Sequence, residues 1–321
     1  MTLYDVPAPA KLNLFLHVVG RRDDGYHLLQ TAFRFIDLCD VLHYEKRSDG
    51  RIVCEGPNPD LAHEDDLVVR AARALQRATG TPYGAQISYQ KNIPSGAGLG
   101  GGSSDAATTL LALNRLWRTG LNRRELMALA LPLGADVPVF IFGQPAFAEG
   151  IGEILSPLAL PERAYVVIQP RQHVPTTGVF SAPELTRNSP SVRITVFADW
   201  QKVEAEKEGL LACSVFDEKT AGMARNTGYF GRNDLEPVVC SRYPRVREAA
   251  LRLGQLGIDA RMTGSGACFF VEFVTLEQAR LCQREIVVKI PCSNSGKEAV
   301  IENTWACPGL LDHPLRYWVH S

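Results

Sequence analysis

Hydrophobic and polar residues alternate along residues 8–19, where Lys11, Asn13 and Phe15 belong to a mainly apolar stretch. A period of two is typical of a β-strand, whose successive side chains point to opposite faces. A polar turn at 21–25 follows this strand. Further strands are expected at 28–44, 51–55 and 84–91, and the short apolar runs 137–142 and 164–169 are compatible with strands.

A period near 3.6 predicts the helices. Ala106, Leu110, Leu113 and Trp117 are spaced at i, i+4, i+7 and i+11 and give one apolar face of a helix. Other helices are expected at 65–78 behind an acidic cap, near 123–131, and at 245–256 with Ala249, Leu251 and Leu253 close to the apolar side.

Two features of the turns and linkers indicate how these elements are connected. Ser48–Asp49–Gly50 is expected to join the strands at 28–44 and 51–55 as a hairpin. The chain has 321 residues, which suggests two domains. Pro157 to Pro161 is the best boundary, and it predicts domains at 1–158 and 159–321.

Composition and charge exclude several classes of protein. Of the residues, 45% are apolar, which is usual for a folded soluble chain, and the net charge is −1. A general nucleic-acid or anionic-membrane binder normally carries a basic excess, so neither partner is expected. No run approaches the roughly 18 apolar residues of a membrane span, and no secretory signal is visible. The eight cysteines are scattered without metal-site spacing, which favours free thiols in the cytoplasm.

The segment with the strongest chemical signal is a glycine-rich loop that leads directly into the helix with Leu110 and Trp117. Glycine allows backbone N–H groups to approach a ligand closely, and the start of a helix adds unpaired N–H groups. Hydroxyl groups at the helix cap complete a site suited to polyphosphate. The loop reads Pro94, Ser95, Gly96, Ala97, Gly98, Leu99, Gly100, Gly101, Gly102, Ser103, Ser104 and Asp105.

Other interpretations of this loop are weaker. No Gly-Lys-Ser/Thr follows, so it is not the common P-loop. Gly98-Leu99-Gly100 begins a dinucleotide fingerprint, but no acidic residue about 20 positions onward completes one. A flexible linker is the plain alternative, although a linker would rarely end in so abrupt an amphipathic helix.

Phosphoryl transfer also requires a cation and a group that orients or deprotonates the acceptor hydroxyl. Lys11 lies within an apolar strand, either solvated at an edge or buried beside an anionic partner. Asp136 stands between small residues and an apolar run, either as a turn cap or as a catalytic carboxylate. If the two side chains meet, each makes burial of the other tolerable, and Asp136 stays ionised as a base.

Three motifs together resemble those of the GHMP small-molecule kinases, named for galactokinase, homoserine kinase, mevalonate kinase and phosphomevalonate kinase. They are Pro9-Ala10-Lys11-Leu12-Asn13-Leu14, the loop Pro94–Ser104, and Met262-Thr263-Gly264-Ser265-Gly266-Ala267-Cys268. The three occur in family order across most of the chain. One branch is matched further by Gly25-Tyr26-His27, Leu133-Gly134-Ala135-Asp136-Val137-Pro138 and Gly231-Arg232-Asn233-Asp234-Leu235-Glu236.

The resemblance to this branch implies ATP-dependent phosphorylation of the 2-hydroxyl of 4-diphosphocytidyl-2-C-methyl-D-erythritol, a step of the non-mevalonate route to isoprenoids. It implies Lys11 and Asp136 as the catalytic pair and Pro94 to Ser104 as the ATP phosphate loop. Tyr26, His27 and Phe180 then hold the cytosine, with Asn13 and Thr176 as further substrate contacts. Taken alone, Phe180 is more simply a core aromatic.

The same resemblance implies an α+β fold of two domains. The first is similar to ribosomal protein S5 domain 2, with a left-handed crossover, and the second has a ferredoxin-like α+β layout. ATP and Mg²⁺ are the implied co-substrate and metal, with Ser104 as a candidate hydroxyl contact. Oligomeric state stays open between monomer and homodimer. The alternatives are a GHMP kinase with another acceptor and a nucleotide-binding relative without turnover.

Three parts of the sequence depart from the family pattern. Asp66 stands where the family often has Asn beside the adenine, and residues 201–226 and 286–304 fit the family poorly. The segment Gly309-Leu310-Leu311-Asp312-His313-Pro314-Leu315 returns to the usual tail. These departures concern the adenine contact and the details of the second domain.

Overall fold

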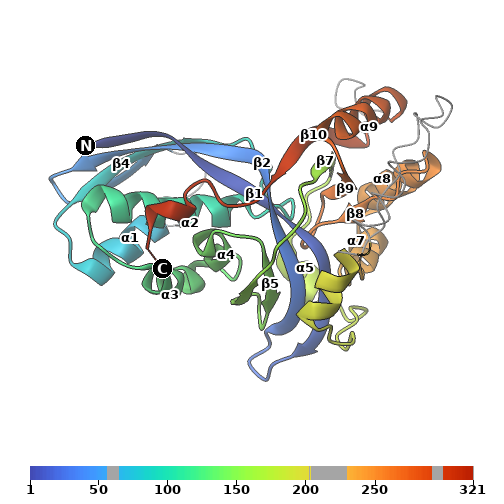
Figure 1. Cartoon of the computed structure of the whole chain (residues 1–321), viewed down its shortest axis with the longest axis horizontal. Helices are drawn as coiled ribbons and strands as arrows, with labels where there is room; N and C mark the ends of the chain where they lie inside the picture. Colours follow the sequence, from blue (N-terminus) through green and yellow to red (C-terminus); the bar gives the residue numbers. More distant parts are fainter. Residues whose placement is uncertain (56–64, 202, 204–229, 291–298, 321) are drawn as a thin grey trace.

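The computed structural model describes residues 1–55, 65–201, 203, 230–290 and 299–320. Two long antiparallel strands, β1 (Thr2–Arg21) and β2 (His27–Arg47), run through the whole molecule (Figure 1). The polar turn expected between them is present. Residues 8 to 18 of β1 are buried without interruption, so the strand has apolar neighbours on both faces. None of the described helices is long and apolar enough to span a membrane.

Most of the described sheet is built around β2. One edge of β2 pairs with β1 along most of its length. The other edge pairs in succession with β4 (Gly84–Gln90), β10 (Ile301–Leu310) and β5 (Ala146–Glu149), and β5 continues to β6 (Ile154–Pro157). Because β10 belongs to the end of the chain, the sheet passes from the first half of the sequence into the second.

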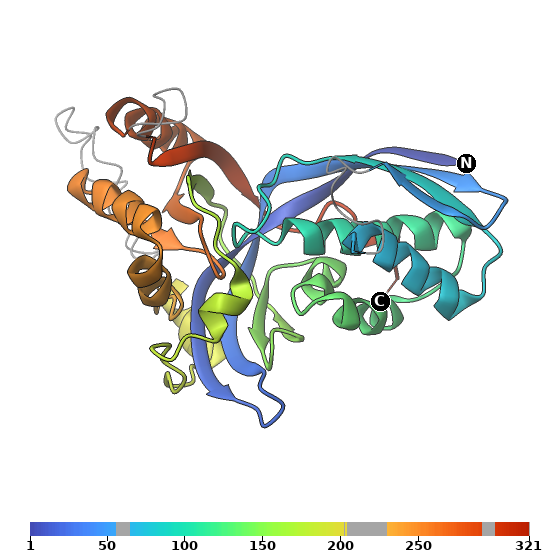
Figure 2. The same cartoon turned by 180° about the vertical axis from the view of Figure 1, so that it is seen from behind.

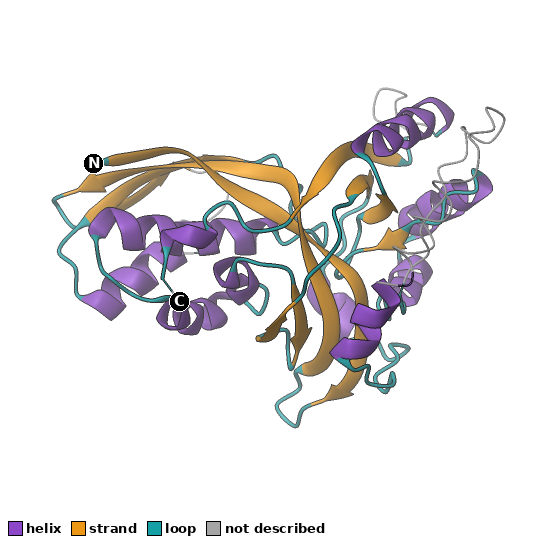
Figure 3. Ribbon diagram, in the orientation of Figure 1, coloured by secondary structure: helices purple, strands orange, loops and turns teal. Residues whose placement is uncertain are grey.

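Helices cover one face of the sheet in the first half, as Figure 3 shows. They are α1 (Leu67–Thr79), α2 (Gly101–Trp117), α3 (Arg123–Ala130), the 3₁₀ turn η1 (Leu131–Leu133) and α4 (Val137–Phe142). Asp66 caps α1 by accepting a hydrogen bond from the Val68 N–H, and Asn122 with Glu125 forms a capping box on α3. All four residues of the expected apolar face on α2 are buried.

The described elements of the second half follow a β-α-β-β-α-β order, as expected for a ferredoxin-like layout. The strands β7 (Ala164–Pro170), β8 (Arg261–Met262), β9 (Phe269–Phe273) and β10 lie in the order β10-β7-β9-β8. The helices, seen from behind in Figure 2, are α5 (Thr176–Phe180), α7 (Glu236–Arg242), α8 (Pro244–Gln255) and α9 (Leu276–Lys289), followed near the chain end by η3 (Arg316–Trp318).

The structure corrects three expectations about secondary structure. Residues 137–142 form the helix α4 rather than a strand, since Pro138 stands in its first turn and a short apolar run does not by itself distinguish strand from helix. The strand β3 (Ile52–Glu55) does not form a hairpin with β2, because β4 lies between them and pairs with both. Leu251 on α8 is 61% exposed, whereas Ala249 and Leu253 are buried.

The division at residue 158 stays a prediction, and the C-terminal segment crosses it. Leu315 and Val319 pack into the hydrophobic core formed by α1, α2, α4 and the first strands. The poorly fitting segments were placed at 201–226 and 286–304; of these, residues 202, 204–226 and 291–298 lie outside the described residues.

Candidate active site

A cavity of about 800 Å³ is lined by residues from both halves of the chain. The side chains of Lys11, Asn13, Asp136, Thr176 and Phe180 all line it. So do Tyr26 and His27, Gly264 and Ser265, and most of the glycine-rich loop, namely Pro94–Gly98 and Gly100–Ser103. The sequence-predicted site residues are therefore gathered in one place, with Leu99 and Ser104 as the exceptions.

Lys11 and Asp136 form an ion pair in this cavity, with Nζ 3.1 Å from Oδ2. The Lys11 side chain is 3% exposed and that of Asp136 is 37% exposed. Lys11 Nζ also donates to Asn13 Oδ1 at 2.5 Å and to the Gly98 carbonyl oxygen at 3.2 Å. The pair predicted from sequence thus meets, with the ammonium buried on its strand and the carboxylate open to a ligand.

The free edge of β1 holds this arrangement in place. Proline at positions 7 and 9 is tolerated on an edge strand, where no partner strand requires its N–H. Further along, four backbone N–H groups of β1 are bound by loops that line or flank the cavity. Over 2.8–3.0 Å, Lys11 donates to the Leu99 carbonyl, Asn13 to the Thr263 hydroxyl, Leu16 to the Arg232 carbonyl and Val18 to the Asp234 carboxylate.

The glycine-rich loop depends on backbone conformations that favour glycine. Gly96, Gly98 and Gly100 have φ of +62°, +78° and +72°. A Cβ on Gly98 would overlap the backbone carbonyl of Thr263, and a Cβ on Gly100 would lie 3.1 Å from Lys11 Cε. The glycine-rich loop, the motif at 262–268 and Lys11 therefore pack so closely that no side chain fits at Gly98 or Gly100.

The cap of α2 differs from the expectation. Gly100 is the N-cap and no side chain caps the helix, so neither Ser103 nor Ser104 has that role. Ser104 is fully buried, and its hydroxyl donates to the Pro9 carbonyl at 2.7 Å. Ser104 therefore ties the loop to β1, and its hydroxyl is turned away from the cavity in which a metal complex would lie.

The three aromatic site residues predicted from the sequence, Tyr26, His27 and Phe180, line the same cavity. The His27 and Phe180 rings are 5.2 Å apart, with an angle of 36° between their planes. Tyr26 is 59% exposed, which leaves its ring available to a ligand. Phe180 closes the short helix α5; it is half-buried, packs against the hydrophobic core of the second half and also lines the cavity. Thr176, on the same helix, shares a 2.8 Å hydrogen bond with the Ser265 hydroxyl.

Sequence reasoning missed a buried charge cluster beneath the loop. Lys91 Nζ contacts Asp40 Oδ2 and lies 2.6 Å from Asp105 Oδ2. Asp40 also accepts from the backbone N–H groups of Asn92 and Ile93. Since Lys91 precedes the loop and Asp105 follows it, the cluster fixes both ends of the loop; the charged residues that flank the glycines were the available signal.

The cluster has strong electrostatic effects. Burial raises the pKa of Asp105 to about 7, although Lys91 acts to lower it. Burial alone would lower the pKa of Lys91, but the attraction of Asp105 and Asp40 raises it.

Asp66 stands at the position where the sequence left the adenine contact in question. Its carboxylate already has two partners within the protein: it caps α1 and accepts a 2.7 Å hydrogen bond from the Tyr89 hydroxyl.

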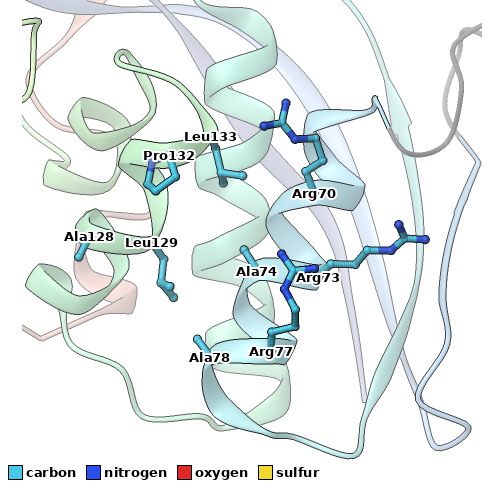
Figure 4. Close-up of a pocket in the computed structure, with 9 residues that line it drawn as sticks. All are labelled: Arg70, Arg73, Ala74, Arg77, Ala78, Ala128, Leu129, Pro132 and Leu133. Atoms are coloured by element: carbon cyan, nitrogen blue, oxygen red, sulfur yellow. The ribbon is translucent and has the colours of Figure 1, made fainter. Parts of the chain in front are cut away.

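A second cavity, of about 540 Å³, lies outside this region between α1 and the segment of α3 and η1 (Figure 4). Its described lining contains arginine, alanine, leucine and proline, with no carboxylate, imidazole or thiol to move a proton. The lining residues are Arg70, Arg73, Ala74, Arg77, Ala78, Ala128, Leu129, Pro132 and Leu133. The candidate chemistry therefore belongs to the first cavity.

Comparison with known proteins agrees with this geometry. The family model described as GHMP kinases N terminal domain matches residues 66–144, and the one described as GHMP kinases C terminal matches residues 217–288. A 4-diphosphocytidyl-2-C-methyl-D-erythritol kinase of Bordetella parapertussis is 57% identical over 100% of both chains. One of Thiobacillus denitrificans is 52% identical over 96% of both. The chain belongs to the GHMP kinase family.

Solved structures of the family support the fold. A crystal structure of 4-(cytidine 5'-diphospho)-2C-methyl-D-erythritol kinase has a TM-score of 0.73 and 35% identity, covering 96% of this chain and 99% of the other. The homoserine kinase of Cytophaga hutchinsonii has a TM-score of 0.60 at 17% identity, with 97% and 95% covered, and shows the fold alone. As a member of the family, the chain is a small-molecule kinase that uses ATP.

Gly98→Ala should lower the affinity for ATP about tenfold or more, equivalent to roughly 1.4 kcal/mol, because the new Cβ meets a backbone carbonyl that cannot rotate away. Titration calorimetry with ATP measures this. Gly120→Ala is the matched control: its φ of +75° is similar, but no atom lies within 4 Å of the new Cβ. The control should lose about 1–2 kcal/mol of stability and keep its ATP affinity. Equal loss of affinity in both variants would contradict the loop contact.

The free energy of unfolding of Asp105→Asn, taken relative to that of the wild type, should increase as the pH rises from 5 to 8. The unfolded carboxyl has a pKa near 3.9, whereas burial raises the folded pKa to about 7. Between these values the unfolded chain releases a proton that the folded chain keeps, so the wild-type free energy of unfolding falls as the pH rises. The Asn variant lacks this loss.

Urea denaturation at pH 5 and pH 8 measures the difference. Asp49→Asn is the control, since hydrogen bonds from Arg47 and from the Arg51 backbone hold the pKa of exposed Asp49 at about 2. Its effect on the free energy of unfolding should be the same at both pH values. An Asp105→Asn effect that is also independent of pH would show that the folded carboxyl is ionised throughout.

Proposed function

We propose that this chain phosphorylates the 2-hydroxyl of 4-diphosphocytidyl-2-C-methyl-D-erythritol with ATP, giving the 2-phosphate and ADP. One observation carries the proposal: a single cavity is lined by the phosphate loop, the Lys11–Asp136 ion pair and the Tyr26, His27 and Phe180 group. Relatives at 50–57% identity bear the name of that kinase. The product belongs to the non-mevalonate route to isoprenoid precursors.

Asp136 and Lys11 form the proposed catalytic pair. Asp136 accepts the proton of the 2-hydroxyl while the hydroxyl oxygen attacks the γ-phosphorus of ATP. The bond from the γ-phosphorus to the bridging oxygen breaks, and ADP leaves with the electron pair. Lys11, 3.1 Å from Asp136, holds the carboxylate in place and stabilises the charge that develops on the transferred group.

The loop from Pro94 to Ser104 is the proposed ATP phosphate site. Its backbone N–H groups and the positive end of the α2 dipole favour binding of a negatively charged ligand. Mg²⁺ would enter as its ATP complex and neutralise phosphate charge, largely through phosphate oxygens and waters. The described residues form no cluster of three metal-binding side chains, so the protein's contribution falls to single oxygen donors that line the cavity, such as Asp136 and the Ser103 hydroxyl.

The cytidyl end of the acceptor is proposed to lie against Tyr26, His27 and Phe180. Aromatic side chains stack on a pyrimidine, and an imidazole hydrogen-bonds its edge. Asn13 and Thr176 line the same cavity and are candidate contacts to the polyol. A cytoplasmic location, and a state of monomer or homodimer, stay predictions from the sequence.

The acceptor test measures ADP release with Mg·ATP and four alcohols: the cytidyl polyol, mevalonate, homoserine and galactose. Turnover with the cytidyl compound alone is expected. Turnover with another acceptor would keep the Lys11–Asp136 chemistry and overturn the cytosine pocket. Folded protein that binds ATP but turns over none of the four would favour a binding protein without catalysis.

Asp136→Ala should reduce kcat about 10²-fold or more, the scale of a lost general base, while ATP still binds. Steady-state kinetics and ATP calorimetry measure the two effects. Asp23→Ala is the matched control, since this exposed carboxylate lies in the turn at 21–25 and does not line the cavity. Near-normal turnover by Asp136→Ala would remove Asp136 from the base role.

A further inference from the structure

Arg187 connects the two parts of the aromatic group, although neither the sequence motifs nor the proposed mechanism uses it. Its Nε–H donates to His27 Nε2 at 3.0 Å. Its Nη2 donates to the carbonyl oxygens of Phe180 at 3.2 Å and Ala182 at 2.6 Å, and its Nη1 donates to that of Leu185 at 3.0 Å. The half-buried guanidinium thus joins the start of β2 to the segment that follows α5.

The contact with His27 determines where the imidazole proton lies. A guanidinium has five N–H donors and no acceptor, and it stays protonated in proteins. His27 Nε2 must therefore be the acceptor and carry no proton. A neutral imidazole has one N–H, so the proton is on Nδ1.

The surroundings of His27 support the neutral form. Burial lowers its pKa, and the positive charges of Arg187 and Arg21 lower it further. Asp24 and Asp136 are the acidic side chains among the described residues that line the same cavity. The Asp24 carboxylate accepts from Arg22, and the Asp136 carboxylate is paired with Lys11. Nδ1 makes no hydrogen bond to the described part of the chain, while His27 itself lines the cavity.

We propose that Arg187 is a positioning residue that fixes His27 as the Nδ1–H tautomer, so that the cavity selects a pyrimidine with an acceptor at N3 over one with a donor there. Cytosine has an unprotonated N3, which accepts from Nδ1–H. Uracil has N3–H, which would meet another donor. A site with a fixed donor rejects a mismatched edge because one polar group is then left unpaired.

The same guanidinium fixes the stacking partner. Three of its four hydrogen bonds go to the carbonyls of Phe180, Ala182 and Leu185, so Arg187 holds the backbone that carries the Phe180 ring beside the imidazole. Arg187→Met keeps an unbranched apolar stem and removes all four hydrogen bonds. Arg187→Lys keeps a single cationic donor, so it should restore part of the function that the Met variant loses.

The first experiment measures the tautomer without any substrate. Nitrogen-15 NMR of the seven-histidine chain, with His27 assigned through His27→Gln, should show Nδ1–H and unprotonated Nε2 in wild type at pH 7. In Arg187→Met the His27 pKa should rise and the two tautomers should mix, because the donor to Nε2 and a positive charge are both lost. A wild-type ring with its proton on Nε2, or a ring unchanged by Arg187→Met, would overturn the proposal.

The second experiment measures discrimination by competition of CMP and UMP with the cytidyl acceptor. In Arg187→Met the KM of the acceptor should rise about tenfold and the CMP preference should fall about tenfold, while kcat and the KM of ATP change less than twofold. Arg242→Met is the matched control. Arg242 anchors the same segment through Glu184 and the Gly178 carbonyl, but has no contact with His27.

The outcomes separate two claims, since the selectivity rests on the proposed function and the tautomer does not. The expected NMR result without cytidyl turnover would refute the function and leave the positioning of His27 standing. An equal loss of CMP preference in Arg187→Met and Arg242→Met would show that Arg187 only holds the segment, and that the tautomer does not set selectivity.

Discussion

The site is organised around a positive charge that the fold places where water does not reach. Lys11 projects from the interior of β1, and its side chain is 3% exposed. A buried ammonium destabilises the folded chain unless anionic and polar partners surround it. Asp136, Asn13 and the Gly98 carbonyl supply those partners. Burial of one lysine therefore requires that Asp136, the glycine-rich loop and the first strand come together.

The open edge of β1 is the second part of this constraint. A buried strand edge leaves N–H groups that must find acceptors. Here the acceptors are Leu99, Thr263, Arg232 and Asp234, which belong to three segments that are far apart in sequence. No described strand pairs with this edge of β1. Its N–H groups bind the loops that carry the motifs of the site, and so hold those motifs in position. The same hydrogen bonds that complete the sheet thus fix the geometry of the proposed site.

The sequence predicted those features that depend on local pattern. The strand expected at 8–19, the helix expected at 65–78 and the apolar face of α2 were confirmed because hydrophobic period carries that information; Asp66 is the acidic cap of that helix, which begins at Leu67. The family resemblance implied that Lys11 and Asp136 act as a pair, and the two side chains do meet, whereas the residues alone left their meeting open. The roles of the individual site residues remain proposals.

What the sequence did not predict depends on tertiary context. Residues 137–142 form a helix because Pro138 and the fold, rather than periodicity, decide a six-residue apolar run. The strand β4 lies between β2 and β3 and pairs with both, an arrangement that the short turn at 48–50 did not indicate. Lys91 and Arg187 gain their importance from partners that are distant in sequence, such as Asp40 and His27.

The two proposed parts of the site are built differently. The proposed phosphate site consists of sheet edge, glycine backbone and buried charge. The proposed acceptor site consists of half-buried or exposed side chains on a turn and a five-residue helix, held by Arg187. The fold is shared with a homoserine kinase at 17% identity. Replacement of the Tyr26–His27 turn and the 176–187 segment would change the acceptor pocket and leave the Lys11 network intact, since no hydrogen bond of Lys11 Nζ goes to either segment.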